Sequence, residues 1–231
     1  MKDAKPILIA YWLLTLACFA AVIAMVFAYT PTEQTMGPVQ KIFYLHLPVA
    51  INTFLAALVV CIASVGYLWQ RRLWWDDLAL AAGKVTVVFC GVVLLTGMIW
   101  GKSAWGHWWT WSPRLTFSLV LFLLYLVYLM IRPAIESPQR RAVVSAVYGL
   151  VAFLDVPLVY LSVRLMPDIH PTEIALEPRM QLTLGLWFIP VTLLMFGLLR
   201  ARYLLNVRER ALRQAAEEPS LSTPDVEGRL A

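Results

Sequence analysis

The sequence predicts an all-α membrane protein, a polytopic bundle of six transmembrane helices with both termini on the cytoplasmic side. The composition supports this class, since 61% of the 231 residues are hydrophobic and only 14% are charged, which is typical of multi-pass membrane proteins rather than of soluble domains. Six apolar runs reach or approach the ~20 residues that a helix needs to cross a bilayer. The lysines and arginines are divided unequally between alternate connections, which sets the expected orientation.

The six runs define the predicted elements. We expect each to be a helix, because in lipid a single segment satisfies its backbone polar groups only in that form. The first run follows Lys2 and Lys5, as a secretory signal does, but it is too long for the apolar part of a signal peptide, so we expect a retained anchor. In chain order the runs cover residues 7–29, 45–69, 78–100, 115–131, 143–163 and 182–199.

The basic residues predict the orientation of the bundle. Thirteen lysines and arginines lie in the amino terminus, the second and fourth connections and the carboxyl-terminal tail, against five in the first, third and fifth connections. Because cytoplasmic segments carry the excess of such residues, we place the odd-numbered connections outside. We expect residues 1–204 to form the membrane domain, and residues 205–231 to form a cytoplasmic tail that starts as a helix and becomes disordered from Glu217.

The net charge and the cysteine positions also exclude some functional classes. The net charge of +5 comes from residues that flank apolar runs rather than from one basic patch, so we expect no nucleic-acid partner. Cys18, Cys61 and Cys90 each lie within an apolar run, and no Cys-x-x-Cys pair is present for dithiol chemistry or covalent haem attachment. We interpret all three as small apolar side chains that pack inside the bundle.

The segment from Trp100 to Thr116, which joins the third run to the fourth, carries the main functional signal. It holds five of the ten tryptophans within twelve residues. One interpretation is an aromatic belt, but a belt spreads its rings over many helix ends on both sides of the membrane. Large, rigid indoles gathered in one loop favour a surface that binds a flat apolar ligand, and we prefer this interpretation. The five are Trp100, Trp105, Trp108, Trp109 and Trp111.

All three histidines fall on the outward side. His46 precedes the second run and His170 precedes the sixth, so both lie near the mouth of the predicted bundle. Singly, each is explained as a polar residue at the membrane surface, but two neutral imidazoles on opposite sides of an iron atom are a common way to ligate haem. We therefore predict His46 and His170 as a ligand pair and leave His107 open between ligand contact and surface. Arg114 follows the tryptophans and is the preferred partner for a haem propionate.

Two other functions stay open from the residues alone. Asp155 stands near the middle of the fifth run, where a carboxylate is costly and is a functional candidate. It is also explained by protonation, or by bonds to backbone groups that Pro157 frees. A small-solute or lipid transporter would use Asp155 to line an aqueous path. An assembly subunit without a ligand of its own would use the cytoplasmic connections to hold partners.

Three segments resemble one family. They read Gly-Pro-Val-Gln-Lys-Ile-Phe-Tyr-Leu-His-Leu-Pro at 37–48, Trp-Gly-His-Trp-Trp-Thr-Trp-Ser-Pro-Arg-Leu-Thr at 105–116, and Asp-Val-Pro-Leu-Val-Tyr-Leu-Ser-Val at 155–163, which His170 follows. Together they resemble the CcmC haem-handling proteins of cytochrome c maturation, over nearly the whole chain. The tryptophan-rich signature is shared in looser form with the longer CcmF and CcsA proteins, so the length here indicates CcmC.

The resemblance implies a function and a set of partners. CcmC-like proteins hold haem b without a covalent bond at the periplasmic face of the bacterial inner membrane, and pass it to the haem chaperone CcmE in a complex with CcmA, CcmB and CcmD. Carried over, His46 and His170 are the axial ligands, and the five tryptophans form the platform for the porphyrin. No conventional turnover enzyme is expected, and whether the protein assists covalent attachment of haem to the chaperone stays open.

One position departs from the family pattern. The signature normally reads Trp-Asp-x-Arg-Leu-Thr, and this chain has Ser112 where the aspartate is expected. A serine can still cap a helix, but it cannot form an ion pair with Arg114. The substitution therefore bears on how Arg114 is held and on how the chaperone docks.

Overall fold

The computed structural model describes residues 4–170 and 176–217, and within these ranges the regular elements are all helices. Six helical segments are long and apolar enough to cross a membrane, which confirms the predicted all-α bundle of six spans and makes the chain a multi-pass membrane protein. In chain order the elements are α1 (Ala4–Ala28), η1 (Pro38–Ile42), α2 (Phe43–Gln70), α3 (Leu73–Trp105), α4 (Pro113–Ile131), η2 (Arg132–Ala134), α5 (Pro138–Phe153), α6 (Asp155–Leu165) and α7 (Pro178–Glu217).

Two helices differ from the predicted runs in ways that matter for the site. α3 continues beyond the predicted end at Trp100 to Trp105, so Trp105 belongs to the helix rather than to the loop. The helix ends at Gly106, whose φ of 80° lies in the left-handed region that suits glycine. The fifth span is broken at Leu154 into α5 and α6.

α7 is the longest helix, with 40 residues, or ~60 Å at 1.5 Å per residue. That length is about twice the thickness of the hydrocarbon core of a bilayer. The residues after 204, which we expected to start the tail as a helix, continue α7 without a break to Glu217. The rest of the predicted disordered segment lies outside the described residues.

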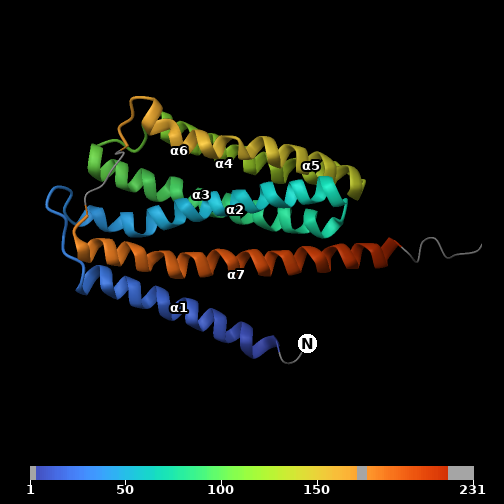
Figure 1. Ribbon diagram of the computed structural model, residues 1–231, viewed down its shortest axis with the longest axis horizontal. Coiled ribbons are helices and arrows are strands. Elements are labelled where there is room, and N and C mark those ends of the chain that lie inside the picture. Colours follow the sequence, from blue (N-terminus) through green and yellow to red (C-terminus); the bar gives the residue numbers. More distant parts are fainter. Residues whose placement is uncertain (1–3, 171–175, 218–231) are drawn as a thin grey trace, which may run out of the picture.

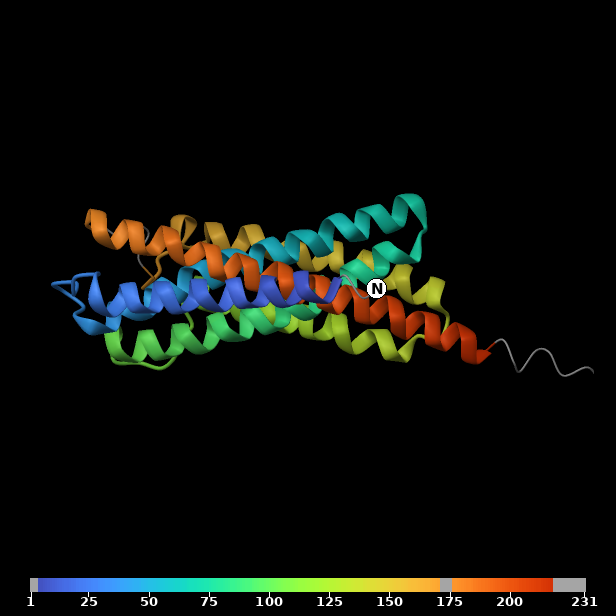
Figure 2. The ribbon, with the colours of Figure 1, turned by 90° about the horizontal axis from the view of Figure 1, so that it is seen from below.

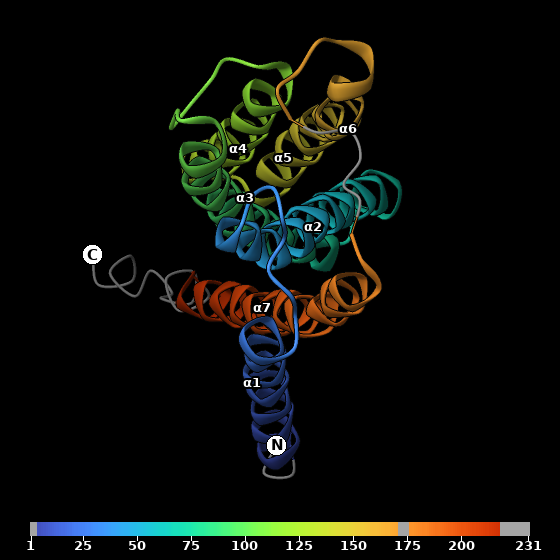
Figure 3. The same cartoon turned by 90° about the vertical axis from the view of Figure 1, so that its left-hand side faces the viewer.

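The helices run along one long direction and form stacked layers. Figures 1 and 2 show the connections α1–α2, α3–α4 and α6–α7 at one end, here called the aromatic end. The connections α2–α3 and α4–α5 lie at the other end, together with the end of α7. Seen end-on, α1 lies on α7, α7 lies against α2 and α3, and α4, α5 and α6 cover the far side of that pair (Figure 3). The pair of α2 and α3 is therefore the centre of the bundle.

Small side chains let α2 and α3 pack closely. The two helices are joined only by Arg71 and Arg72, and Arg71 turns the chain with a φ of 54°. In lipid, helix association depends on van der Waals packing, which small residues improve by letting backbones approach. This hairpin fixes which residues of α2 and α3 face each other at the aromatic end. Almost fully buried alanines recur along both helices, namely Ala56, Ala57 and Ala63 in α2 and Ala79, Ala81 and Ala82 in α3.

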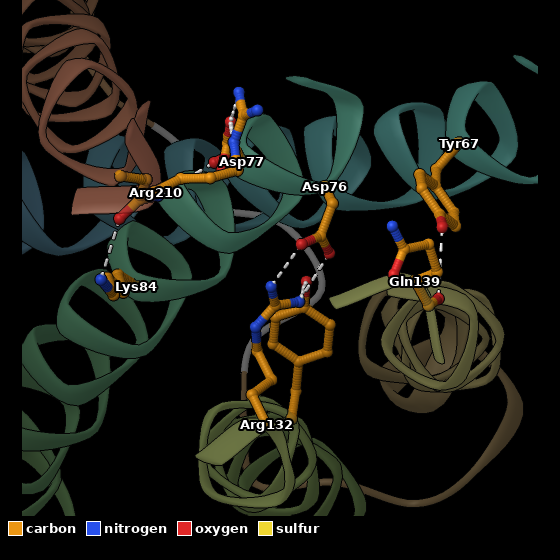
Figure 4. A network of polar contacts seen from close by, with 9 residues as sticks. Tyr67, Asp76, Asp77, Lys84, Arg132, Gln139 and Arg210 are labelled. Carbon is orange, nitrogen blue, oxygen red and sulfur yellow. Dashed lines mark hydrogen bonds and ion pairs between the residues drawn. The ribbon is translucent and has the colours of Figure 1, made fainter. Parts of the chain in front are cut away.

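At the end opposite the aromatic end, two adjacent aspartates tie α3 to its neighbours (Figure 4). Asp76 accepts two hydrogen bonds from the guanidinium of Arg132, at 2.8 and 2.7 Å, and both side chains are buried. Asp77 makes contacts of 2.7 and 3.0 Å with Arg210 of α7, and its carbonyl oxygen accepts from Asn206 at 3.0 Å. Since buried charges are stable only when paired, these acids hold α3 against η2 on one side and α7 on the other.

We predict that the two aspartates differ in their contribution to stability. Asp76→Ala leaves the charge of Arg132 buried with only the neutral Tyr128 hydroxyl as a hydrogen-bond partner, and loss of the carboxylate costs about 3–5 kcal/mol. The side chain of Arg210 is 31% exposed and can turn to water, so Asp77→Ala costs at most about 1 kcal/mol. Thermal unfolding of the purified protein in detergent measures both, and equal losses of stability in the two variants would contradict this assignment.

Candidate functional site

At the aromatic end, α2, α3, α4 and α6 surround a cavity of about 180 Å³. Most of its wall is apolar, with side chains such as Phe43 and Leu47 from α2 and Val93 and Met98 from α3. Such a lining suits an apolar ligand, because apolar burial drives binding while a few polar groups fix the orientation. The residues of the wall that carry side-chain nitrogen atoms are His46, Trp100, Trp105, Trp109, Arg114 and His170.

A chain of hydrogen bonds fixes the tautomer of His46. Its Nδ1 atom lies 2.9 Å from Oγ1 of Thr96, and the Thr96 hydroxyl lies 2.7 Å from the carbonyl oxygen of Val92. A hydroxyl has one hydrogen and a carbonyl can only accept, so Thr96 donates to Val92 and accepts from the Nδ1–H of His46. The Nε2 atom of neutral His46 keeps a free lone pair, which is the form in which an imidazole binds a metal.

The imidazole of His46 lies directly against the backbone of α3. A Cβ atom at Gly97 would lie 3.3 Å from Cε1 of His46, which is tighter than ordinary van der Waals contact, so a larger residue there would push the ring away. Glycine at this position and threonine one residue earlier together hold the His46 ring in one orientation. The orientation of His46 is thus set by α3, although His46 itself belongs to α2.

His170 reaches the same cavity from the connection between α6 and α7. Its ring centroid lies 5.9 Å from that of Trp100 and 6.2 Å from that of Trp105, and the ring of His46 lies 6.5 Å from that of Trp100. The structure therefore brings the two histidines of the predicted pair against the same indole. The Nδ1 atom of His170 lies 3.3 Å from Nη1 of Arg114. Because a guanidinium can only donate, Nδ1 accepts this bond, and the proton of a neutral ring resides on Nε2.

Arg114 holds several parts of the site together. Beside its contact with His170, its Nη2 donates to the carbonyl oxygen of Tyr160 in α6 at 3.3 Å. Its backbone N–H donates to the carboxylate of Asp168 at 2.7 Å. Its Nε atom is buried and has no hydrogen-bond partner among the described residues. The guanidinium thus places a positive charge at the wall of the cavity, with one donor still unused.

The five tryptophans separate into two groups. Trp100, Trp105 and Trp109 line the cavity, whereas Trp108 and Trp111 lie outside its wall and are 56% and 76% exposed. In the first group, the Nε1 atoms of Trp100 and Trp109 are buried and have no partner among the described residues. A buried indole N–H usually has a partner, so these two donors are available to a polar group of a ligand.

Three other residues that the sequence singled out do not line the cavity. His107 is exposed just after the end of α3. Asp155 is the first residue of α6 and is only 6% exposed, and its Oδ2 has no partner among the described residues. Ser112 precedes α4, but its hydroxyl makes no capping bond, and the carboxylate of Asp168 binds the start of the helix instead.

The donor set limits which metals the site can hold. The described residues contain no group of three or more His, Cys, Asp or Glu that could hold a metal ion by themselves. The cavity offers two imidazoles, from His46 and His170. A pair of this kind suits a metal whose other ligands arrive with it, as the iron of a porphyrin does.

Sequence reasoning missed Thr96, Gly97 and Asp168. Thr96 lies four residues before Trp100, and this spacing places both on one face of α3, so a signal was present in the sequence. The absence of a side chain at Gly97 is explained only by the imidazole of His46, which belongs to another helix. Asp168 lies two residues before His170, but no local pattern connects it with the backbone of Arg114, which is 54 residues away.

Comparison with known proteins gives one family. Residues 1–221 match the family described as Heme exporter protein C. Proteins of that name from Bradyrhizobium diazoefficiens and Paracoccus denitrificans are each 36% identical, over 143 and 141 residues, which is 62% and 61% of this chain and 54% and 58% of their own lengths. One from Escherichia coli is 30% identical over 193 residues, 80% of this chain and 78% of its own. The matched region thus spans little more than half the length of the first two relatives.

Proposed function

Because this chain belongs to the heme exporter protein C (CcmC) family, we propose that it binds haem b non-covalently at the aromatic end and presents it to the haem chaperone CcmE in cytochrome c maturation. One observation carries the proposal: His46 and His170, from distant parts of the chain, line one apolar cavity together with three indoles and an arginine. Each kind of group matches a part of haem, since imidazole ligates iron, indole covers the porphyrin plane and guanidinium pairs with propionates.

The two imidazoles differ in which ring nitrogen carries the proton, and therefore in which nitrogen could bind iron. His46 already presents a lone pair on Nε2, because Thr96 holds the proton on Nδ1. His170 does not, because Arg114 donates to Nδ1 and the ring proton resides on Nε2. Ligation through Nδ1 of His170 would therefore require Arg114 to release that atom, and ligation through Nε2 would require the ring proton to move to Nδ1. A haem propionate provides the reason for release, since a charged carboxylate binds a guanidinium more strongly than a neutral imidazole does.

The three indoles of the cavity wall support binding of a porphyrin. If each of Trp100, Trp105 and Trp109 covers ~100 Å² of the porphyrin, apolar burial contributes about 7 kcal/mol before the costs of association. The three indoles line one cavity at the aromatic end, and we propose that one edge of the macrocycle stays outside it. An open edge suits a protein that passes its ligand to another.

We further propose that the aromatic end faces the periplasm and that both termini face the cytoplasm of a bacterial inner membrane. The excess of lysine and arginine in the amino terminus, the tail and the even-numbered connections supports this orientation. The description of the relatives as heme exporters suggests an ABC-type complex, and we propose CcmA, CcmB and CcmD as its other subunits. Trp108 and Trp111, exposed outside the cavity wall, are then suited to contact CcmE.

The first test is binding of haem by the purified protein. Titration with haem should give the absorption bands of six-coordinate low-spin iron. His46→Ala or His170→Ala should weaken binding by at least about 10-fold and change the bands, because an axial ligand is lost. His107→Ala is the matched control, since His107 is exposed and does not line the cavity. If both cavity variants kept the wild-type spectrum and affinity, ligation by these histidines would be wrong.

A second prediction concerns the orientation of His46. Thr96→Val should lower haem affinity roughly 10-fold, because loss of the partner that orients a metal-binding histidine has an effect of this size. The control is Thr86→Val, since Thr86 in the same helix also donates to the carbonyl four residues earlier, whereas the hydrogen bond to His46 belongs to Thr96. Equal haem affinities in the two variants would mean that Thr96 does not set the tautomer of His46.

A third prediction separates the two groups of tryptophans. Trp109→Leu removes roughly half of one indole contact, about 1 kcal/mol or several-fold in Kd, so it should weaken haem binding by the purified protein. Trp111→Leu should leave haem binding unchanged and slow the transfer of haem to purified CcmE. A haem titration and a transfer assay measure the two effects. If both variants lost the same haem affinity, Trp111 would be one of the residues that contact the porphyrin.

A further inference from the structure

We propose that Asp168 is a positioning residue that holds His170 at the cavity by capping α4. Both oxygens of its carboxylate accept a backbone hydrogen bond, Oδ2 from the N–H of Arg114 at 2.7 Å and Oδ1 from the N–H of His170 at 2.8 Å. One side chain thus joins the start of a membrane helix to the backbone of a predicted iron ligand. The effect of Asp168 on haem rests on the function proposed above, whereas its effect on α4 does not.

The start of α4 needs a hydrogen-bond acceptor that the adjacent sequence does not provide. The first N–H groups of a helix have no partner within it, and Pro113 has no N–H at all, which makes Arg114 the first donor. Ser112 stands at the capping position, but its hydroxyl is buried and has no partner among the described residues. Asp168 supplies the acceptor from another connection. A carboxylate is favoured there, because the amino end of a helix carries a partial positive charge.

The second hydrogen bond makes the same carboxylate a local constraint on His170. An aspartate that accepts from the N–H two residues later closes an Asx-turn, which fixes the direction of the chain. Here that direction carries the imidazole toward the rings of Trp100 and Trp105. Because the cap and the turn share one side chain, the position of His170 is set by α4 and not only by the end of α6 at Leu165.

The side chain of Arg114 also contacts the connection that carries His170. This contact and the hydrogen bonds of Asp168 differ, because the guanidinium can move while the bonds of Asp168 stay in place. The guanidinium donates to Nδ1 of His170 and to the carbonyl oxygen of Tyr160. When the guanidinium leaves His170 for a propionate, the two bonds of Asp168 still hold the backbone of His170 in place. Asp168 therefore lets the side chain of Arg114 move without releasing the connection that carries the histidine.

The test uses the full-length protein in detergent and three variants. Asp168→Ala removes both bonds. Ser112→Asp combined with Asp168→Ala returns a carboxylate to the start of α4, but on a residue with no link to His170. Glu33→Ala is the matched control, because the Glu33 carboxylate also accepts from two backbone N–H groups in another connection at the aromatic end.

Two readouts separate the cap from the position of the histidine. Hydrogen exchange, read by mass spectrometry on peptides that cover residues 106–116 and 161–170, reports both bonds without haem. We expect Asp168→Ala to raise exchange in both peptides, to lower haem affinity roughly 10-fold and to shift the spectrum toward five-coordinate high-spin iron. The double variant should recover protection at 106–116 but not the low-spin spectrum, and Glu33→Ala should change none of these properties.

Two results would overturn the role of Asp168. One is unchanged exchange in Asp168→Ala. The other is full recovery of the spectrum in the double variant, which would mean that the cap alone matters and that Asp168 does not position His170. Failure of the proposed function has a different signature: the wild-type protein would bind no haem, or His170→Ala would keep its spectrum, while exchange in the two peptides would still respond to Asp168→Ala.

Discussion

The close packing of α2 against α3 is the constraint on which the rest of the site depends. Membrane helices are held together largely by packing, and the size of the side chains at their contact sets the distance between backbones. Buried alanines recur along both helices, and at the aromatic end Gly97 lets the ring of His46 lie on α3. At that distance the hydroxyl of Thr96 reaches Nδ1 of His46. A larger residue at Gly97 would therefore reorient the imidazole before it changed the fold.

The fold was predictable to the extent that the membrane dictates it. A segment in lipid must be apolar and helical, so composition alone located six spans. The ends of the helices were less predictable, because a helix that leaves the membrane continues into polar residues, as α3 and α7 do. The break at Leu154 directly precedes Asp155 and Pro157, and a proline inside a helical run is the kind of residue that interrupts a helix. Asp76 and Asp77 pair with arginines far along the chain, which no local pattern indicates.

The candidate site was predictable in its members but not in its geometry. Histidines at two helix mouths and an arginine beside the tryptophans indicated the participants, and the cavity wall contains all three. The separation of Trp108 and Trp111 from the wall depends on where α3 ends, which spacing does not fix. Hydrogen bonds between distant elements, such as the one from the backbone of Arg114 to Asp168, have no signal in the local sequence. Asp155 does not line the cavity, so nothing in the cavity favours a transporter with an aqueous path.

The contact between Arg114 and His170 has a consequence for the binding and release of any ligand that uses both residues. A cargo that recruits both residues must break this contact on arrival, and the contact re-forms on departure. If haem binds both residues as proposed, this contact competes with it, which would lower the net affinity and give the empty site a defined arrangement. Under the proposed function, the free energy of the re-formed contact between Arg114 and His170 would offset part of the cost of releasing haem.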